Sequence, residues 1–241
     1  MLSLKTIEEL TKKYQTTEVN VAREYCQHLF LSHLYQKKSS EFILFKGGTA
    51  LRIIYRSPRF SEDLDFSCFD IKTNDLEEII LNTISEIENT GIKIEIKDAK
   101  VTSGGYLGMF YFDFLNFKEA IRIECSFRGK ARIKPEVILV NSDYIPPFNI
   151  FCLPFKHLIK EKINALLKRS KPRDFYDAYF LLRMILPMDK ANLNLDKILQ
   201  KLDASKIDFK KELSLLLSQS HHTILKDFKN ILRKEIKKYG Y

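Results

Sequence analysis

The spacing of apolar residues predicts a helix followed by a buried strand in the first part of the chain. Apolar positions from Val19 to Phe30 recur at steps of three and four, and Thr17 suits the N-cap of such a helix. Residues 42–45 then form a short apolar run that stops at two glycines, Gly47 and Gly48. A run this short before a Gly-Gly pair is typical of a buried strand that enters a tight turn.

Helical and alternating segments follow in turn up to residue 89. Helical spacing resumes over residues 49–55, whereas residues 61–66 alternate polar with apolar side chains, as a strand does. Residues 74–89 are amphipathic with helical spacing, and either Asn74 or Thr73 is expected to cap that helix.

Beyond Gly91 the period changes from helical spacing to alternation. Three alternating or β-branched and aromatic runs, 92–97, 106–115 and 120–127, follow one another without an intervening helix. Residues 116–118 suit a hairpin turn between the last two, so antiparallel pairing is expected within a mixed sheet.

The chain turns helical after a stretch with no sustained period. Residues 135–154 contain Pro146-Pro147 and are expected to form a linker. We therefore predict an α+β fold with two domains: a mixed β-sheet with helices over residues 1–150, and a helical bundle over residues 151–241.

Composition indicates a folded protein with a possible polyanionic partner. Of 241 residues, 45% are hydrophobic and 29% are charged, and the net charge of +9 favours a nucleic acid, although lysine-rich surfaces also occur without one. Four scattered cysteines form no CxxC pair, which argues against a zinc or redox site. With no signal peptide and no membrane-spanning run, we expect a cytoplasmic protein without a membrane partner.

A phosphate-binding turn is one interpretation of Gly47-Gly48-Thr49. A strand, two glycines and a helix leave backbone N–H groups free for phosphate oxygens, although the same residues often form a tight turn and nothing more. The turn is not a P-loop, because no GxxxxGK[ST] frame includes it.

Two aspartates strengthen the phosphate interpretation. Asp63 and Asp65 follow Gly48 by fifteen and seventeen positions and lie two apart on the predicted strand, so both carboxylates point to one face and can share a divalent cation. The alternative is a solvated polar face. Their mutual repulsion requires a metal or basic neighbours, for which we expect three arginines, Arg52, Arg56 and Arg59.

A third carboxylate on a neighbouring strand would complete the metal site. In residues 121–128 apolar and polar side chains alternate, which places Glu124 on the open face with Arg122 and Ser126. Asp113 on the preceding strand is the rival, and an ordinary solvated sheet face is the structural alternative.

Two segments resemble the signatures of a known family. KGGTAL at 46–51 followed by RFSEDLDF at 59–66, and EKINAL at 161–166 followed by Arg169 and RDFYD at 173–177, resemble the AbiEii/AbiGii-type nucleotidyltransferases. These are the toxins of type IV abortive-infection toxin–antitoxin pairs and include the MenT toxins. The two signatures span residue 46 to about residue 182.

The second signature also has structural explanations. Pro172 suits the first turn of a helix, so Asp174 can be an N-terminal helix acid, and Asp177 can pair with Arg173 one turn away. Lys162 and Arg169 share a helix face. The resemblance instead places Lys162 and one of the two aspartates in the active site, and the choice between Asp174 and Asp177 stays open.

The resemblance implies a nucleotidyltransferase fold that moves a nucleoside monophosphate from an NTP to an acceptor hydroxyl, with Mg²⁺ or Mn²⁺ as cofactor. Asp63, Asp65 and Glu124 are the expected metal ligands, Glu124 serving as third ligand or base. The nucleotide is expected to contact Lys46, Gly47, Gly48, Thr49, Ser61, Arg169 and Arg173. RNA, with the tRNA 3′ end first, is the expected acceptor, and an antitoxin the expected partner. Transfer to a protein or small molecule and an inactive NTP- or RNA-binding module are the alternatives.

Overall fold

The computed structural model describes residues 1–129, 133–184 and 193–239, and the chain divides into two compact units. The first unit comprises Met1–Arg56 and Phe60–Pro154, and the second comprises Ser57–Arg59 and Phe155–Tyr241. Three residues from the first half of the sequence therefore belong to the second unit.

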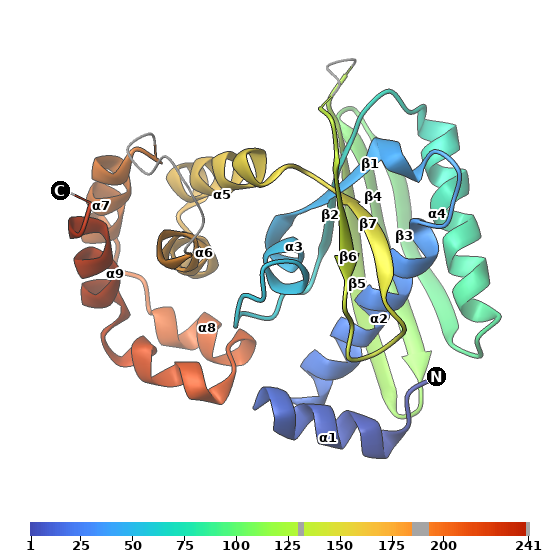
Figure 1. The fold of residues 1–241 in the computed structure, drawn as a ribbon, viewed down its shortest axis with the longest axis horizontal. Helices are drawn as coiled ribbons and strands as arrows, with labels where there is room; N and C mark the ends of the chain where they lie inside the picture. The colour runs from blue at the N-terminus through green and yellow to red at the C-terminus, as the bar shows by residue number, and fades with distance from the viewer. Residues whose placement is uncertain (130–132, 185–192, 240–241) are drawn as a thin grey trace. The chain divides into compact units, whose positions relative to one another are not determined.

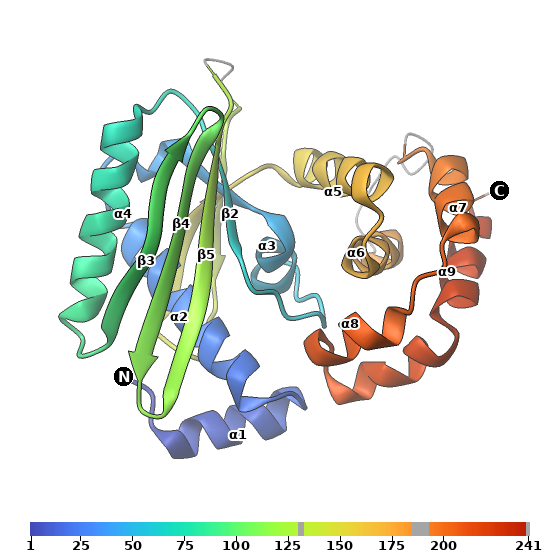
Figure 2. The same cartoon turned by 180° about the vertical axis from the view of Figure 1, so that it is seen from behind.

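The first unit is a mixed sheet with helices (Figures 1 and 2). Its strands are β1 (Ile43–Lys46), β2 (Leu64–Cys68), β3 (Lys93–Thr102), β4 (Gly105–Phe114), β5 (Phe117–Phe127), β6 (Glu136–Val140) and β7 (Phe148–Cys152). Its helices are α1 (Leu4–Tyr14), α2 (Glu18–Leu34), the short 3-10 helix η1 (Ser40–Phe42), α3 (Gly47–Ile53) and α4 (Thr73–Glu88).

The seven strands lie in the order β3-β4-β5-β2-β1-β7-β6. The three long strands β3, β4 and β5 form the predicted antiparallel meander. The short strand β2 is parallel to β5 on one side and antiparallel to β1 on the other. The predicted α+β fold with a mixed sheet is confirmed.

One face of the sheet carries the core of the first unit. Apolar residues of β2, β4 and β5, such as Phe66, Phe110 and Ile121, are buried on that face, against which α2 and α4 pack (Figures 1 and 2). Thr17 caps α2 as predicted, because its side chain accepts a hydrogen bond from the backbone N–H of Asn20. The opposite face of β5 carries mainly polar residues, among them Lys118, Arg122, Glu124 and Ser126.

The second unit contains helices α5 (Phe155–Arg169), α6 (Pro172–Arg183), α7 (Leu195–Ala204), α8 (Phe209–Leu216), η3 (Gln219–Asp227) and α9 (Phe228–Lys237). Aromatic side chains form its centre: Phe209 of α8 packs 5.6 Å from Phe175 and 4.9 Å from Phe228, centroid to centroid. Apolar burial of this kind holds these helices together.

Several predictions of local structure were wrong. Residues 135–154 are not a linker, because β6 and β7 lie within them and complete one edge of the sheet. Their strands are too short to show alternation, and the Pro-Pro pair lies in the turn between them. Strand β2 begins at Leu64, so Asp63 directly precedes the strand. Lys72, rather than Asn74 or Thr73, occupies the N-cap position of α4.

Two further expectations concern the chain as a whole. All four cysteines are free and buried, as small hydrophobic side chains are. Across the described parts of the chain, the helices are too short or too polar to span a lipid bilayer.

Candidate active site

Three charged residues lie side by side across three neighbouring strands of the first unit. Lys46 of β1 is directly opposite Asp65 of β2, and Asp65 is in register with Glu124 of β5. Neighbouring strands are about 4.8 Å apart, and residues in register point to the same face of a sheet. The Lys46 side chain is buried, whereas that of Glu124 is 46% exposed. The row therefore runs from a buried cation to an accessible carboxylate.

The register separates Glu124 from its rival. Glu124 pairs with Leu107 on β4, whereas Asp113 pairs with Lys118, six positions further along the strand. Six residues of a strand span about 20 Å. Asp113 therefore lies far from Asp65, and Glu124 is the carboxylate that the neighbouring strand places beside it.

Asp63 is held by its backbone at the entry to β2. Its carbonyl oxygen accepts a hydrogen bond from the Thr49 hydroxyl on α3. The preceding carbonyl groups of Ser61 and Glu62 accept hydrogen bonds from the Gln27 amide of α2, at 2.9 and 3.2 Å. Two helices thus fix the loop that carries Asp63.

Sequence reasoning missed Gln27. The signal that could have identified Gln27 is its polar side chain within α2, a helix that is buried on nearly all sides. Gln27 itself is 1% exposed. A buried amide must find hydrogen-bond partners, and here they are the carbonyl groups of the aspartate loop.

The glycine turn comes close to Asp65. Gly47 has a positive φ of 84°, and a β-carbon built on it would lie 2.1 Å from Oδ2 of Asp65. Gly48 and Thr49 follow within α3 and are both buried. The turn and the carboxylate therefore share one small region at the end of β1.

The basic neighbour of the carboxylates is Arg122, and the three expected arginines bind elsewhere. Arg122 of β5 lies 3.2 Å from Oδ2 of Asp63 and 3.5 Å from Oε2 of Glu124. Arg52 instead binds Glu24, Arg56 binds the carbonyl oxygen of Asn141, and Arg59 binds Asp177. The prediction for Arg52, Arg56 and Arg59 was wrong, because these pairings depend on contacts between distant segments.

The carboxylates have the chemistry that Mg²⁺ prefers, namely hard oxygen ligands. Asp63 and Glu124 already share one cation, the guanidinium of Arg122. Within the described residues, however, no three His, Cys, Asp or Glu side chains come close enough to hold a metal together. The donors fit an ion that takes one or two carboxylates and keeps several waters, which is usual for Mg²⁺.

Asp177 is buried at the centre of an ion cluster in the second unit. Arg59 donates two hydrogen bonds to its carboxylate, at 2.8 and 3.0 Å, and Lys162 donates one at 2.8 Å. Burial alone would raise the pKa of Asp177, but the two cations outweigh burial and hold the pKa below its ordinary value. Asp177 is therefore a carboxylate shared by two cations.

Asp174 lies at the start of α6. Its carboxylate accepts hydrogen bonds from Arg169, the shortest at 2.8 Å, and from the backbone N–H of Lys171 at 3.0 Å. Pro172 is the first residue of α6, so the prediction of an N-terminal helix acid is confirmed. The cations that donate hydrogen bonds to Asp177 are Arg59 and Lys162, whereas Arg173, its expected partner, lies 3.6 Å from Glu212.

The expected site residues thus form two groups, each within its own unit. The first unit holds Lys46, Gly47, Gly48, Thr49, Ser61, Asp63, Asp65 and Glu124, and the second holds Lys162, Arg169, Arg173, Asp174 and Asp177. Arg122 and Gln27 join the first group, and Arg59 joins the second.

Two solved structures share the fold of this chain at low sequence identity. MenT4, a nucleotidyltransferase toxin from Mycobacterium tuberculosis H37Rv, matches with a TM-score of 0.70 at 16% identity, over 98% of this chain and 89% of that chain. JHP933 from Helicobacter pylori matches with a TM-score of 0.51 at 22% identity, over 93% of this chain and 96% of that chain. These likenesses concern the fold.

Sequence comparison identifies the family. No protein with a curated description matches the chain. The family model of the nucleotidyl transferase AbiEii toxin of type IV toxin–antitoxin systems matches residues 29–239, a range that includes every charged residue of both groups. The chain therefore belongs to the AbiEii family of nucleotidyltransferase toxins of type IV toxin–antitoxin systems.

Proposed function

We propose that this toxin transfers a nucleoside monophosphate from an NTP to the 3′ hydroxyl of a tRNA and releases pyrophosphate. The observation that carries the proposal is the row of Lys46, Asp65 and Glu124 beside the backbone of Gly47. In the reaction the hydroxyl oxygen bonds to the α-phosphorus, and the bond from that phosphorus to the bridging oxygen of pyrophosphate breaks. Glu124, the exposed member of the row, takes the hydroxyl proton.

Asp63 and Asp65 are the residues that hold Mg²⁺ or Mn²⁺ in this proposal. A bound divalent ion neutralises the charge of the phosphate groups and favours the attacking oxygen as an alkoxide. The support is the oxygen chemistry of the two carboxylates and the rigid loop that Thr49 and Gln27 provide for Asp63. Glu124 completes the acidic set as third ligand or as base.

Backbone and cationic groups receive the phosphates. Gly47 and Gly48 add no side chains of their own at the start of α3, and Lys46 supplies a positive charge beside them. In the second unit Lys162 shares Asp177 with Arg59, so two cations have one carboxylate between them. Such a cluster favours an anionic ligand, and we assign Lys162 to phosphate binding.

Exposed lysines of the second unit suit the RNA backbone. Those of α5 and the following turn are Lys156, Lys160, Lys168 and Lys171, and those of η3, α9 and its C-cap are Lys226, Lys234, Lys237 and Lys238. Arg169, 49% exposed, extends the first set. Phosphate contacts of this kind give affinity without base specificity and make binding sensitive to salt.

Labelled nucleotides test the proposal. The purified toxin is incubated with each α-³²P-labelled NTP and Mg²⁺, in separate reactions with deacylated tRNA, total cell protein or an aminoglycoside. We expect label in tRNA, located at the 3′ end by sequencing. Label in protein or aminoglycoside alone would contradict the tRNA acceptor, and RNA binding without any label would favour an inactive module.

A matched pair of variants tests the site itself. Asp65→Asn removes one carboxylate from the row and is expected to lower transfer by at least about a hundredfold. Asp113→Asn makes the same change at an exposed position of β4 opposite Lys118, and is expected to retain wild-type activity. Equal activity of the two variants would rule out the proposed row.

A further inference from the structure

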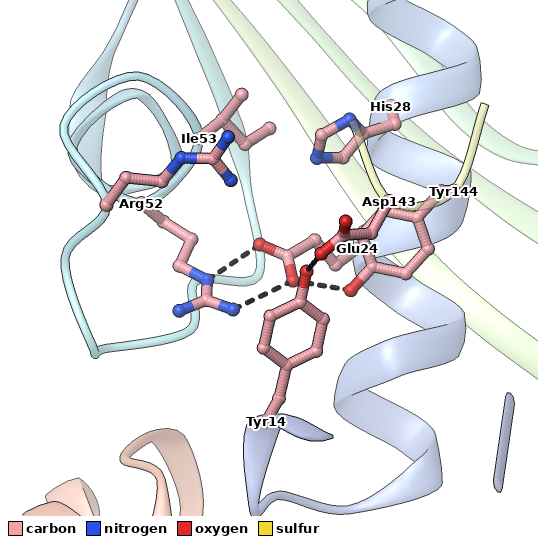
Figure 3. A pocket seen from close by; sticks show the side chains of 8 residues that line it. Tyr14, Glu24, His28, Arg52, Ile53, Asp143 and Tyr144 are labelled. Atoms are coloured by element: carbon pink, nitrogen blue, oxygen red, sulfur yellow. Dashed lines mark hydrogen bonds and ion pairs between the residues drawn. The ribbon is translucent and has the colours of Figure 1, made fainter. Parts of the chain in front are cut away.

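A cavity of about 230 Å³ lies within the first unit, among α1, α2, α3 and the turn between β6 and β7 (Figure 3). Its walls include Tyr14, Glu24, His28, Arg52, Arg56 and Tyr144. None of these residues belongs to the row at Asp65 or to the glycine turn. This volume lies below the roughly 300–1,000 Å³ of pockets that hold drug-sized ligands, so the cavity suits a molecule smaller than a nucleoside triphosphate.

The two carboxylates of the cavity are already neutralised by protein groups. Glu24 accepts two hydrogen bonds from Arg52, at 2.7 and 3.1 Å, and one from the Tyr144 hydroxyl at 2.7 Å. Asp143 accepts hydrogen bonds from Lys13, at 2.6 Å, and from the Tyr14 hydroxyl. Figure 3 shows the Arg52, Glu24 and Tyr144 contacts converging at one side of the cavity. Neither carboxylate therefore needs a ligand cation.

His28 is a buried polar side chain on the cavity wall. It is 3% exposed, and its Nδ1 has no hydrogen-bond partner among the described residues. Burial is the main reason that the pKa of His28 falls to about 4, so the ring is neutral at physiological pH and carries one N–H donor. A buried ring nitrogen without a partner is costly unless a ligand or water satisfies it.

Arg56 is an exposed cation of the cavity wall that forms no ion pair within the described parts of the chain, although its charge helps to lower the pKa of Asp143. Its guanidinium donates one hydrogen bond, to the carbonyl oxygen of Asn141 at 2.7 Å. Its backbone has a φ of 60°, the left-handed region that side chains other than glycine rarely adopt. Strained residues of this kind are often found at ligand-binding sites.

We propose that this cavity binds a small ligand through one anionic group, a carboxylate or a phosphate. Arg56 supplies the positive charge and His28 the N–H donor, while Ile53 and the rings of Tyr14 and Tyr144 contact the remainder of the ligand. The site is separate from the glycine turn and from the aspartates, and it does not depend on the proposed transfer reaction.

Histidine resonances report directly on this site. The protein labelled with ¹⁵N-histidine is titrated with sodium phosphate or sodium acetate up to 100 mM, against sodium chloride of the same ionic strength. We expect the His28 signal, assigned with His28→Phe, to shift saturably with half-saturation in the millimolar range. A shift with phosphate alone, with acetate alone or with both identifies which anionic group the cavity accepts.

Variants at position 56 decide whether the cavity is responsible. Arg56→Gln is expected to weaken binding at least tenfold, as is Arg56→Gly, which also suits the left-handed backbone and so remains folded. Lys93→Gln makes the same charge change at an exposed position outside the cavity and should have no effect. Lys46→Gln tests whether phosphate bound at the glycine turn contributes to the His28 signal. We expect the His28 titration of this variant to match that of the wild type.

Two results would overturn the proposal. One is the absence of a saturable His28 shift with either anion, which would mean that water alone fills the cavity. The other is a shift of the same affinity in wild type, Arg56→Gln and Arg56→Gly, which would mean that the anion binds elsewhere.

Discussion

Gly47 lies directly against Asp65, so that a β-carbon at position 47 would fall 2.1 Å from Oδ2 of the aspartate. Asp65 lies on β2, Gly47 is the first residue after β1, and the two are adjacent because Lys46, the last residue of β1, pairs with Asp65. The positive φ of Gly47 adds a second requirement for glycine. One glycine therefore sets both the turn and the position of a carboxylate.

Gly47→Ala is expected to move Asp65 and to abolish most of the transferase activity. Backbone strain and the clash together should cost about 1–3 kcal/mol of the free energy of unfolding. Gly91→Ala serves as the strain control, because Gly91 has a φ of 92° and its nearest neighbour is the flexible end of Met1. Urea unfolding and nucleotide transfer are measured together, and full activity in Gly47→Ala would contradict the close approach.

Asp177→Asn is expected to destabilise the second unit by about 3–5 kcal/mol. The substitution leaves the buried guanidinium of Arg59 without a carboxylate, and an uncompensated buried charge is costly. Asp174→Asn is the matched control, because its partner Arg169 is half exposed and stays hydrated, so we expect about 1–2 kcal/mol there. Equal losses in urea unfolding would contradict the central role of Asp177.

Stability is expected to fall as the pH is lowered from about 6.5 to about 4, because of His28. The pKa of His28 is about 4 in the folded protein, so over this range the unfolded chain binds a proton that the folded chain does not. The loss should reach about 2–3 kcal/mol. The negative charge of Glu24 raises the pKa of His28 and so opposes the effect of burial, whereas the positive charges of Arg52 and Arg56 lower this pKa further.

His28→Phe checks the assignment, because phenylalanine keeps the aromatic packing on Tyr144 and Phe148 without a titrating group. The variant should lose the dependence of stability on pH between 6.5 and 4 and keep any loss at lower pH. Urea unfolding at half-unit pH steps gives both curves, and parallel curves would assign the effect to another group.

Arg122→Gln is expected to make stability more dependent on Mg²⁺. Without the guanidinium, Asp63 and Glu124 lose their shared cation, and their repulsion lowers the melting temperature in EDTA. Adding Mg²⁺ should restore more of the melting temperature than it does in the wild type. Lys118→Gln, on the same strand but paired with Glu95, is the control, and the same Mg²⁺ response in all three proteins would contradict this role.

Period and register explain which parts of the site could be predicted from the sequence. Alternation placed Glu124 on the open face of β5, and the two-residue spacing of Asp63 and Asp65 set them beside it. These relationships depend on strand geometry, which the sequence pattern carries locally. The role of Gly47 was suggested by the same pattern, although its contact with Asp65 required the pairing of β1 with β2.

The partners of the charged residues could not be predicted in this way. Arg59 was expected to lie near Asp63 and Asp65, which follow it closely in the sequence. It binds Asp177 instead, 118 positions away. Arg173 is one turn from Asp177 and still pairs with Glu212. Side chains choose partners by tertiary contact, and helical spacing offers a possible neighbour without excluding a better one.

The membership of Ser57–Arg59 in the second unit affects how the protein can be divided. A fragment that starts at Phe155 contains the helices of that unit but lacks Arg59. In this fragment Asp177 keeps Lys162 and loses Arg59, and the β-bridge between Arg59 and Leu217 is lost as well. Cleavage after Pro154 would therefore not yield two complete folding modules. An exchange of the helical unit between related proteins would have to include residues 57–59. Because these residues lie only a few positions before Asp63, the helices and the aspartate loop are expected to be exchanged together.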